Sequence, residues 1–475
     1  MSELPYDKTD PYSIEAYALR LLNIRLRDID IDHEKLLKVI KGKGSLGQAI
    51  EEFYFLYKPN STAGPDFPEA GLELKTTPVI SDKAKFLKAK ERLVFNIINY
   101  EEEYDKEFVE SSFWEKNRLL LLMFYLHEKS ELDVDLVFKL IRLFRFPAVD
   151  LKIIKDDWEK IRSKIRDGLA HELSEGDTFY LGACTKGANK ETVRVQPNSD
   201  ILAKQRAYSL KAKYLNIIIQ KTLANDFELF DQTEDYKKVL GAGERDPLVK
   251  HSKLDPSGIL SPIIKTIDEF QPGETIEQLV IKRFEPFYGY SESQLNHKFG
   301  LKRSIGKSKY YDLSKAILNV DGDVIEEFEK ADIQLKTIRV EKSGNIKESM
   351  SFPQIKYKEI VDENWEDSEL YDILSNKFFF VVFKRGDDNE FYLNKVKFWN
   401  MPWNDIISMS VIWEDTKSKI LSNDFEHFIK ISAGLIGHIR PKAINASDLM
   451  ETHLGTFEKK KSFWIGSHYI KKAIE

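Results

Sequence analysis

The sequence has almost no cysteine, no long apolar run and no excess of basic residues. Cys184 is the single cysteine among 475 residues, so neither a disulfide nor a cysteine-cluster metal site can form within one chain. No apolar run approaches the roughly 20 residues that a membrane span needs, and the N-terminus has neither the basic start nor the apolar stretch of a secretory signal. We therefore expect a soluble, cytoplasmic protein with no membrane partner.

The formal net charge of −6 gives no sign of a nucleic-acid partner, because proteins that bind through phosphate contacts often carry a basic excess. An average charge, however, hides local patches. Basic residues are crowded into two short segments, Lys204, Arg206, Lys211 and Lys213 in one and Lys459, Lys460, Lys461, Lys471 and Lys472 in the other. Each segment is either a solvated surface or a phosphate-binding track, and charge alone leaves both open.

Length and composition predict two globular domains. The chain is too long for one ordinary core, and 42% hydrophobic with 32% charged residues is typical of globular proteins. Apolar periodicity predicts helices over residues 13–40, 46–57 and 158–165, a buried strand over 119–126, and a strand from Leu72 that is stopped by Pro78. The predicted fold class is α/β or α+β, a mixed sheet flanked by helices.

The second half of the sequence repeats the first at an offset of about 257 residues. Short matches recur in the same order: Glu73-Leu-Lys-Thr returns as Gln334-Leu-Lys-Thr, and Trp158-Glu returns as Trp413-Glu. A tandem duplication explains collinear matches better than chance does. We expect two copies of one fold.

The middle of the chain loses its periodicity. Residues 226–272 are rich in Asp, Gly, Pro and Lys, which predicts a linker. We therefore expect one copy in residues 1–225 and the other in residues 273–475.

Asp66, Glu73 and Lys75 form the pattern that carries chemistry. Residues two apart in a strand share a face, so Glu73 and Lys75 point the same way, and the turn holding Asp66 can bring its carboxylate beside Glu73. Two neighbouring carboxylates repel unless a hard cation such as Mg²⁺ lies between them. Such a set could hydrolyse a phosphodiester, with Lys75 opposing the developing charge or orienting water. Glu51 could add a carboxylate and Lys116 a phosphate contact, although the spacing by itself also suits an exposed ion pair.

Two blocks of sequence resemble the core of MutH, the strand-nicking mismatch-repair endonuclease. They are Gly44-Ser-Leu-Gly-Gln-Ala-Ile-Glu51 and Pro65-Asp-Phe-Pro-Glu-Ala-Gly-Leu-Glu-Leu-Lys-Thr-Thr-Pro78. The continuation through residues 170–176, 185–189 and 203–211 is similar to the MutH-related type II restriction endonucleases that cut at GATC. The resemblance covers nearly the whole chain and implies two restriction-endonuclease-like domains, with Mg²⁺ as the metal of the family. It implies Asp66, Glu73 and Glu51 as metal ligands, the last of them auxiliary, and Lys75 as the catalytic lysine.

The same resemblance points to residues that contact DNA. It places Lys186 in a base-reading loop, where a lysine can donate to the O6 and N7 acceptors of guanine. It also places the segment with Ser209 and Lys211 near the DNA. Ser209 stands where MutH has a tyrosine, which puts that base contact in doubt.

The second copy keeps only part of the catalytic pattern. In place of Asp66, Glu73, Lys75 and Glu51 it has Glu327, Gln334, Lys336 and Tyr310. The Gln334 carbonyl brings no charge, so a divalent ion should bind poorly and this copy should not cut. The segment with Arg440 and Lys442 resembles the DNA-reading loop of MutH, so we expect this copy to bind DNA as a regulator or an anchor.

We expect a type II restriction endonuclease that uses Mg²⁺ to cut both strands of DNA at GATC, 5′ of the G. One active site breaks one strand, so we expect two chains to assemble on the palindromic DNA. A MutH-like nicking repair enzyme is an alternative against which the duplication argues. A non-cutting DNA-binding protein is another, and the intact Asp66, Glu73 and Lys75 argue against it.

Overall fold

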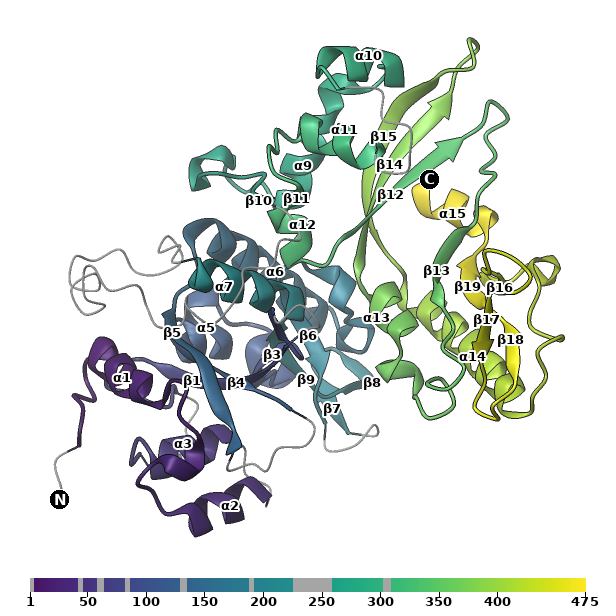
Figure 1. Ribbon diagram of the computed structural model, residues 1–475. Helices are drawn as coiled ribbons and strands as arrows, with labels where there is room; N and C mark the ends of the chain where they lie inside the picture. Colours follow the sequence, from purple (N-terminus) through teal and green to yellow (C-terminus); the bar gives the residue numbers. More distant parts are fainter. Residues whose placement is uncertain are drawn as a thin grey trace.

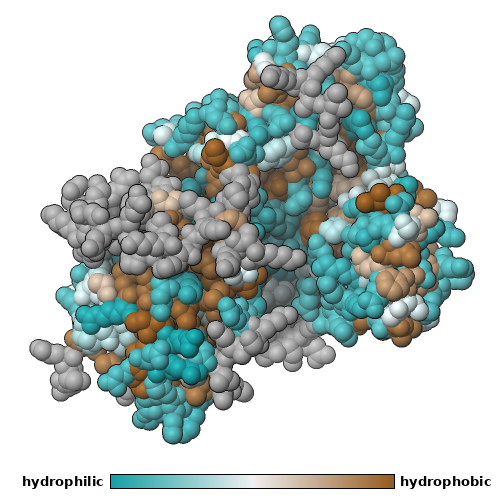
Figure 2. Space-filling model, viewed as in Figure 1, coloured by the Kyte–Doolittle hydropathy of each residue, from teal (hydrophilic) through white to brown (hydrophobic). Residues whose placement is uncertain are grey.

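The structure is a computed structural model that describes residues 4–41, 46–57, 64–81, 86–128, 135–187, 192–224, 259–301 and 309–475. The purple-to-blue first half and the green-to-yellow second half lie side by side (Figure 1). Hydrophilic side chains cover much of the second half in the view of Figure 2. Within the described ranges, no helix is both long and apolar enough to cross a membrane.

The first half is built on a mixed sheet with the strand order β2-β1-β4-β5. Its strands are β1 (Glu73–Ser81), β2 (Leu87–Ala89), β4 (Leu120–Leu126) and β5 (Val137–Phe144). β1 and β4 are parallel, with Glu73 opposite Leu120, whereas the outer pairs are antiparallel. Alternate residues of β4 enter different apolar clusters, Leu120 in one and Leu121 in the other. Both faces of this strand are therefore covered, as its continuous apolar run predicted.

Helices and a second sheet cover these two faces. The helices α1 (Pro11–Ala18), α2 (His33–Lys41) and α3 (Leu46–Phe53) precede the sheet, and α5 (Ser112–Asn117), α6 (Ala148–Arg166) and α7 (Ala212–Leu223) follow β1. The second sheet has the order β3-β9-β6 and consists of β3 (Leu93–Ile97), β9 (Arg206–Leu210) and β6 (Leu181–Thr185). A two-stranded ribbon, β7 (Val193–Gln196) and β8 (Ser199–Lys204), leads into β9.

The second half repeats this plan. Its main sheet is β12 (Gln334–Val340), β14 (Lys377–Arg385) and β15 (Phe391–Asn400), and its second sheet is β13 (Met350–Gln354), β19 (Lys461–Ile465) and β16 (Gly437–Pro441). β12 and β14 are parallel with Gln334 opposite Phe378, which matches Glu73 opposite Leu120. The ribbon β17 (Leu449–Glu451) and β18 (Phe457–Lys459) and the helices α14 (Trp403–Leu421) and α15 (Ser467–Ile474) complete the repeat. The predicted tandem fold is confirmed.

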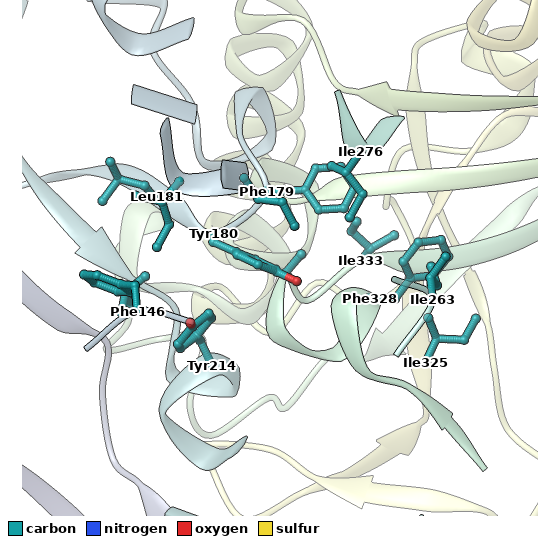
Figure 3. Close-up of a cluster of buried hydrophobic side chains, with 14 of the residues drawn as sticks. Phe146, Phe179, Tyr180, Leu181, Tyr214, Ile263, Ile276, Ile325, Phe328 and Ile333 are labelled. Carbon is teal, nitrogen blue, oxygen red and sulfur yellow. The ribbon is translucent and has the colours of Figure 1, made fainter. Parts of the chain in front are cut away.

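The two copies share one hydrophobic core. Phe179 of the first copy packs edge-on against Phe398 of the second, and their ring centroids lie 5.4 Å apart. Figure 3 shows Tyr180 and Tyr214 of the first copy in the same cluster as Phe328 of the second. Buried contacts between the copies therefore join them into one body.

The segment that leads into the second copy packs on that copy. Residues 226–258 of the expected linker lie outside the described residues. Of the rest, β10 (Leu260–Ser261) pairs with β11 (Val324–Ile325), just before α12 (Glu326–Lys330). The helices α9 (Ile276–Phe284), α10 (Glu292–Lys298) and α11 (Lys309–Ile317) follow along the chain, and α13 (Glu369–Ser375) precedes β14.

Two predicted elements end at different places. β1 continues beyond Pro78 to Ser81. The Pro78 carbonyl faces β2, and the nitrogen of the same residue faces the same side. Pairing of β1 with β2 begins only at Val79, so the N–H that proline lacks is not needed for the sheet. The predicted helix over residues 13–40 is interrupted after Ala18, because Asn23 adopts a left-handed φ of 58°.

Candidate active site

Asp66, Glu73 and Lys75 come together at the start of β1. The backbone N–H of Asp66 donates to Glu73 Oε2 at 3.1 Å, and the N–H of Leu74 donates to Asp66 Oδ2 at 3.0 Å. Lys75 Nζ lies 2.6 Å from Glu73 Oε1. An isolated bridge between Phe67 and Leu72 closes the turn that carries Asp66. The turn therefore brings the two carboxylates together, and the period of the strand adds the lysine on the same face.

Lys116 is a second cation at this site. It comes from α5, and its Nζ lies 3.4 Å from Glu73 Oε1 and 3.9 Å from Asp66 Oδ1. Glu73 is only 1% exposed, so its charge depends on these two lysines. The site thus combines two carboxylates and two lysines at one end of the central parallel strands.

Negative charge is concentrated here. Burial raises the pKa of Asp66 to about 7, helped by the nearby charges of Glu73 and Glu51, and burial and Glu73 also raise the pKa of Glu51. A divalent cation between the carboxylates would relieve this repulsion and favour their ionised forms. In the part of the chain that the structure describes, no three Asp, Glu, His or Cys side chains converge as a complete ligand set. The Asp66 and Glu73 carboxylates are oxygen donors of the kind that Mg²⁺ takes, so the residues present fit this ion, and Glu51 adds negative charge nearby.

The residues of the first copy that were predicted to contact DNA differ in their exposure. Lys186 follows β6 with its side chain exposed, and its backbone pairs with Gln205. Ser209 lies inside the second sheet and is 1% exposed. Lys211 is 6% exposed, and its Nζ donates to the carbonyl of Ala331 in the second copy. The sheet therefore buries Ser209 and the second copy buries Lys211, and their contacts with DNA stay predictions.

Comparison with known proteins agrees with this geometry. A family model described as DNA mismatch repair enzyme MutH matches residues 55–157 and again residues 319–412, which contain the start of β1 and of β12. The type II restriction enzyme Sau3AI of Staphylococcus aureus is 35% identical over 488 aligned positions, which cover 92% of this chain and 93% of that protein. The chain belongs to the Sau3AI family of type II restriction enzymes. It is a site-specific deoxyribonuclease with two MutH-like regions, as the sequence resemblance implied.

Within this Sau3AI-like chain, the second copy uses its matching carboxyl differently. Glu327 is 2% exposed and accepts the backbone N–H groups of Ile263 and Ile264 at 2.8 and 2.9 Å. Tyr310, which takes the place of Glu51, donates to Glu292 at 3.0 Å. The carboxyl that matches Asp66 therefore fixes the polypeptide that leads into the second copy.

Arg440 and Lys442 lie at the end of β16 in the second copy. The exposed guanidinium of Arg440 stacks over Trp464, with its carbon 4.8 Å from the ring centroid. Lys442 is half-buried and donates to the carbonyl of Phe352. Burial of Lys336 and the nearby charge of Lys442 lower the pKa of Lys336. Of the two predicted DNA contacts, Arg440 is the more accessible.

A cleft of about 620 Å³ separates the part of the first copy that contains Lys186 from α13 of the second. Its basic wall includes Arg92 and Lys186, and its acidic wall includes Glu366 and Asp372. Lys204 forms an ion pair with Glu366 across the boundary, and Arg92 lies 3.9 Å from Asp372. Sequence reasoning missed this acidic wall, although the acidic run over residues 362–372 was its available signal.

Proposed function

We propose that this restriction endonuclease uses Mg²⁺ to hydrolyse both strands of DNA at GATC, 5′ of the G, and that the first copy makes every cut. One observation supports the proposal most directly: Lys75 and Lys116 both lie against the neighbouring carboxylates of Asp66 and Glu73. The resemblance to GATC-cutting members of the MutH-related group supports the site. The 35% identity to Sau3AI over nearly the whole chain supports the class of reaction.

Each side chain of the site has a distinct task in this proposal. Asp66 and Glu73 would hold Mg²⁺, which when bound polarises the phosphoryl oxygen and lowers the pKa of water. Lys75, fixed by Glu73 at 2.6 Å, would orient the attacking water or oppose the negative charge that develops on the phosphorus. Lys116 would balance the buried charge of Glu73 and contact a phosphate of the same strand. Lys186 would read a guanine from its exposed loop.

We further propose that the second copy binds DNA without cutting it and regulates the first. Its Glu327 is engaged by the backbone and its Gln334 carries no charge, whereas Arg440 stays exposed. The acidic wall of the cleft opposes the basic wall that contains Lys186. DNA is a denser polyanion than this wall, so binding of DNA would replace the ion pairs of Lys204 with Glu366 and of Arg92 with Asp372 across the cleft.

Double-strand cleavage needs either two chains on one duplex or two successive nicks by one active site, and we propose the first. With one working site per chain, two chains would meet on the two-fold axis of the palindrome. Cleavage rate should then rise more steeply than in proportion to enzyme concentration. A strictly proportional rate with a complex of one chain per duplex would contradict assembly on DNA.

The experiment that tests the proposal is digestion of a plasmid of known sequence with Mg²⁺, comparing the wild type with Glu73→Ala and mapping the fragment ends. Site-specific double-strand ends at GATC that the substitution abolishes support the proposal. Nicks alone would favour a repair-type enzyme. A shift of DNA on a gel without any cleavage would make the chain a binding protein and contradict the assignment.

A further inference from the structure

Arg118 lies against the turn that carries Asp66. Arg118 directly precedes Leu119, whose carbonyl accepts the backbone N–H of Glu73 at 3.0 Å. It therefore lies just before β4, at the edge of the sheet that holds Glu73. A Cβ added at Gly71, in the same turn, would lie 3.1 Å from Arg118 Nη2 and 3.6 Å from its Nε. The guanidinium therefore lies close to Gly71, the one residue of the turn that has no side chain.

Arg118 also differs from the two lysines of the site in having no partner. Lys75 and Lys116 both contact Glu73. The Arg118 side chain is exposed and makes no hydrogen bond or ion pair with any residue in the described ranges. Among the described residues, its charge is thus free to meet a ligand at the catalytic edge. A planar guanidinium can donate two parallel hydrogen bonds to one phosphate group, which an ammonium cannot.

Gly71 is what makes room for this arginine. Its φ of +62° lies in the left-handed region that favours glycine, and its missing Cβ admits the guanidinium at close range. Any other residue would be strained in this turn and would push Arg118 outward. The backbone conformation and the position of the arginine are therefore linked.

The second copy provides an internal comparison for this pair. Gln334 pairs with Phe378 as Glu73 pairs with Leu120. Two residues before each of these positions, the second copy has Asp332 in place of Gly71 and Asn376 in place of Arg118. Asp332 keeps the left-handed backbone with φ of +50°, and its Oδ2 accepts a hydrogen bond from Asn376 Nδ2 at 3.1 Å.

The same count places Leu374 where the first copy has Lys116. The copy that lacks the Glu73 carboxylate has therefore also lost both Lys116 and Arg118, although it keeps Lys336 in place of Lys75. Its turn is instead closed by a buried amide and a carboxylate. The loss of Arg118 together with the metal-binding carboxylate is expected if both serve DNA cleavage.

We propose that Arg118 binds a backbone phosphate of the strand being cut, within one nucleotide of the scissile bond, through both arms of its guanidinium. The inference rests on the proposed function, because it takes the first copy as the site of cleavage. The bound phosphate holds the strand in register with the Asp66 and Glu73 pair. Arg118 is accordingly a substrate-binding residue of the reaction that the sequence pattern did not single out.

Two measurements on the full chain test this. In single-turnover cleavage of a GATC duplex with Mg²⁺, we expect Arg118→Ala to be slower by about 10²-fold and Arg118→Lys to recover part of the rate. Arg166→Ala, at the exposed end of α6, is the matched control and should cut at the wild-type rate. A duplex with one neutral methylphosphonate at the contacted phosphate should slow the wild type but not slow Arg118→Ala any further.

The second measurement does not depend on cleavage. In duplex binding without Mg²⁺, Arg118→Ala should reduce the slope of log K against log salt by about 1, because one phosphate contact is lost. Unchanged slope and unchanged cleavage, with wild-type thermal unfolding, would overturn the role of Arg118 even if the enzyme cuts at GATC. If the wild type does not cut at all, the proposed function fails, and the salt slope still decides whether Arg118 contacts phosphate.

Discussion

Lys330 of the second copy and Asp150 of the first form a buried ion pair, with Lys330 Nζ 2.7 Å from Asp150 Oδ2. Glu326 lies 2.8 Å from the same Nζ, and the hydroxyl of Tyr214 donates to Asp150. Burial lowers the pKa of Lys330, but Asp150 and Glu326 outweigh burial and raise it above its ordinary value. The pair satisfies its hydrogen bonds on both sides of the boundary between the copies.

We expect Lys330→Ala to lower the free energy of unfolding by about 3 to 5 kcal/mol, because it leaves Asp150 charged and unpaired in the interior. The double variant Asp150→Ala with Lys330→Ala should lose less than the sum of the two single variants. Urea unfolding curves measure both. Lys213→Ala breaks a more exposed pair with Glu329 and should cost at most about 1 kcal/mol. Equal effects of Lys330→Ala and Lys213→Ala would contradict a buried coupling.

Glu73→Gln copies into the first site the side chain that the second copy has as Gln334. We expect a fall in cleavage of about 10³-fold or more with normal folding, because the metal site loses a charge and Lys75 loses its partner. The reverse change, Gln334→Glu in the Glu73→Gln background, should not restore cutting, because Glu327 is engaged by the backbone. Plasmid digestion measures both, and restored cutting would show that the second copy is only one residue from activity.

Much of this site follows from local sequence, and the rest depends on long-range packing. The alternation around Glu73 and Lys75 and the apolar run of β4 predict the strands, and seven-residue spacing places Asp66 beside them. The burial of Lys211 could not be predicted, since its partner Ala331 lies in the other copy. The sequence pattern did not single out Arg118, because the residue stands out only when the two copies are compared. Gly71 with Arg118 in one copy corresponds to Asp332 with Asn376 in the other.

Arg440→Ala should weaken binding of DNA by the full chain about 5- to 30-fold, because one exposed cation of the second copy is lost. The exposed guanidinium has no ion-pair partner among the described residues and stacks only on Trp464. Titration of a duplex monitored by fluorescence anisotropy measures the effect. Lys358→Ala, which removes an exposed charge of the same sign paired with Glu451, is the control. An equal loss for both variants would mean that Arg440 acts only through general charge.

Glu327 should make stability depend on pH. Burial raises its pKa to about 7, against the lowering effect of the N–H groups of Ile263 and Ile264 and the charge of Lys330. A carboxyl whose pKa is raised on folding contributes stability that is present below its unfolded pKa of about 4.3 and lost as pH rises through the folded value. The wild type should therefore lose stability relative to Glu327→Gln between about pH 5 and pH 8. Thermal unfolding at several pH values tests this, and parallel curves would contradict it.

The acidic wall of the cleft should restrain the enzyme. Replacing Glu366 and Asp372 together by Ala removes the carboxylates that face Lys204 and Arg92. We therefore expect DNA binding to tighten and cleavage of a DNA with a single site to speed up, each by about 3- to 10-fold. Glu348→Ala, at an exposed pair with Arg339, removes a negative charge elsewhere on the second copy and serves as the control. Slower cleavage by the double variant would mean that the ion pairs stabilise the active form.

The core shared by the two copies limits how this enzyme can be divided or recombined. A fragment ending at Leu223 would open the apolar surface of Phe179, Tyr180 and Tyr214 to water, together with the unpaired charge of Asp150. The nuclease half is therefore not a module that can be detached and fused to a new DNA-binding partner. Changes of specificity in such a chain have to arise by substitution within each copy, since an exchanged copy would have to bring a matching inner surface with it.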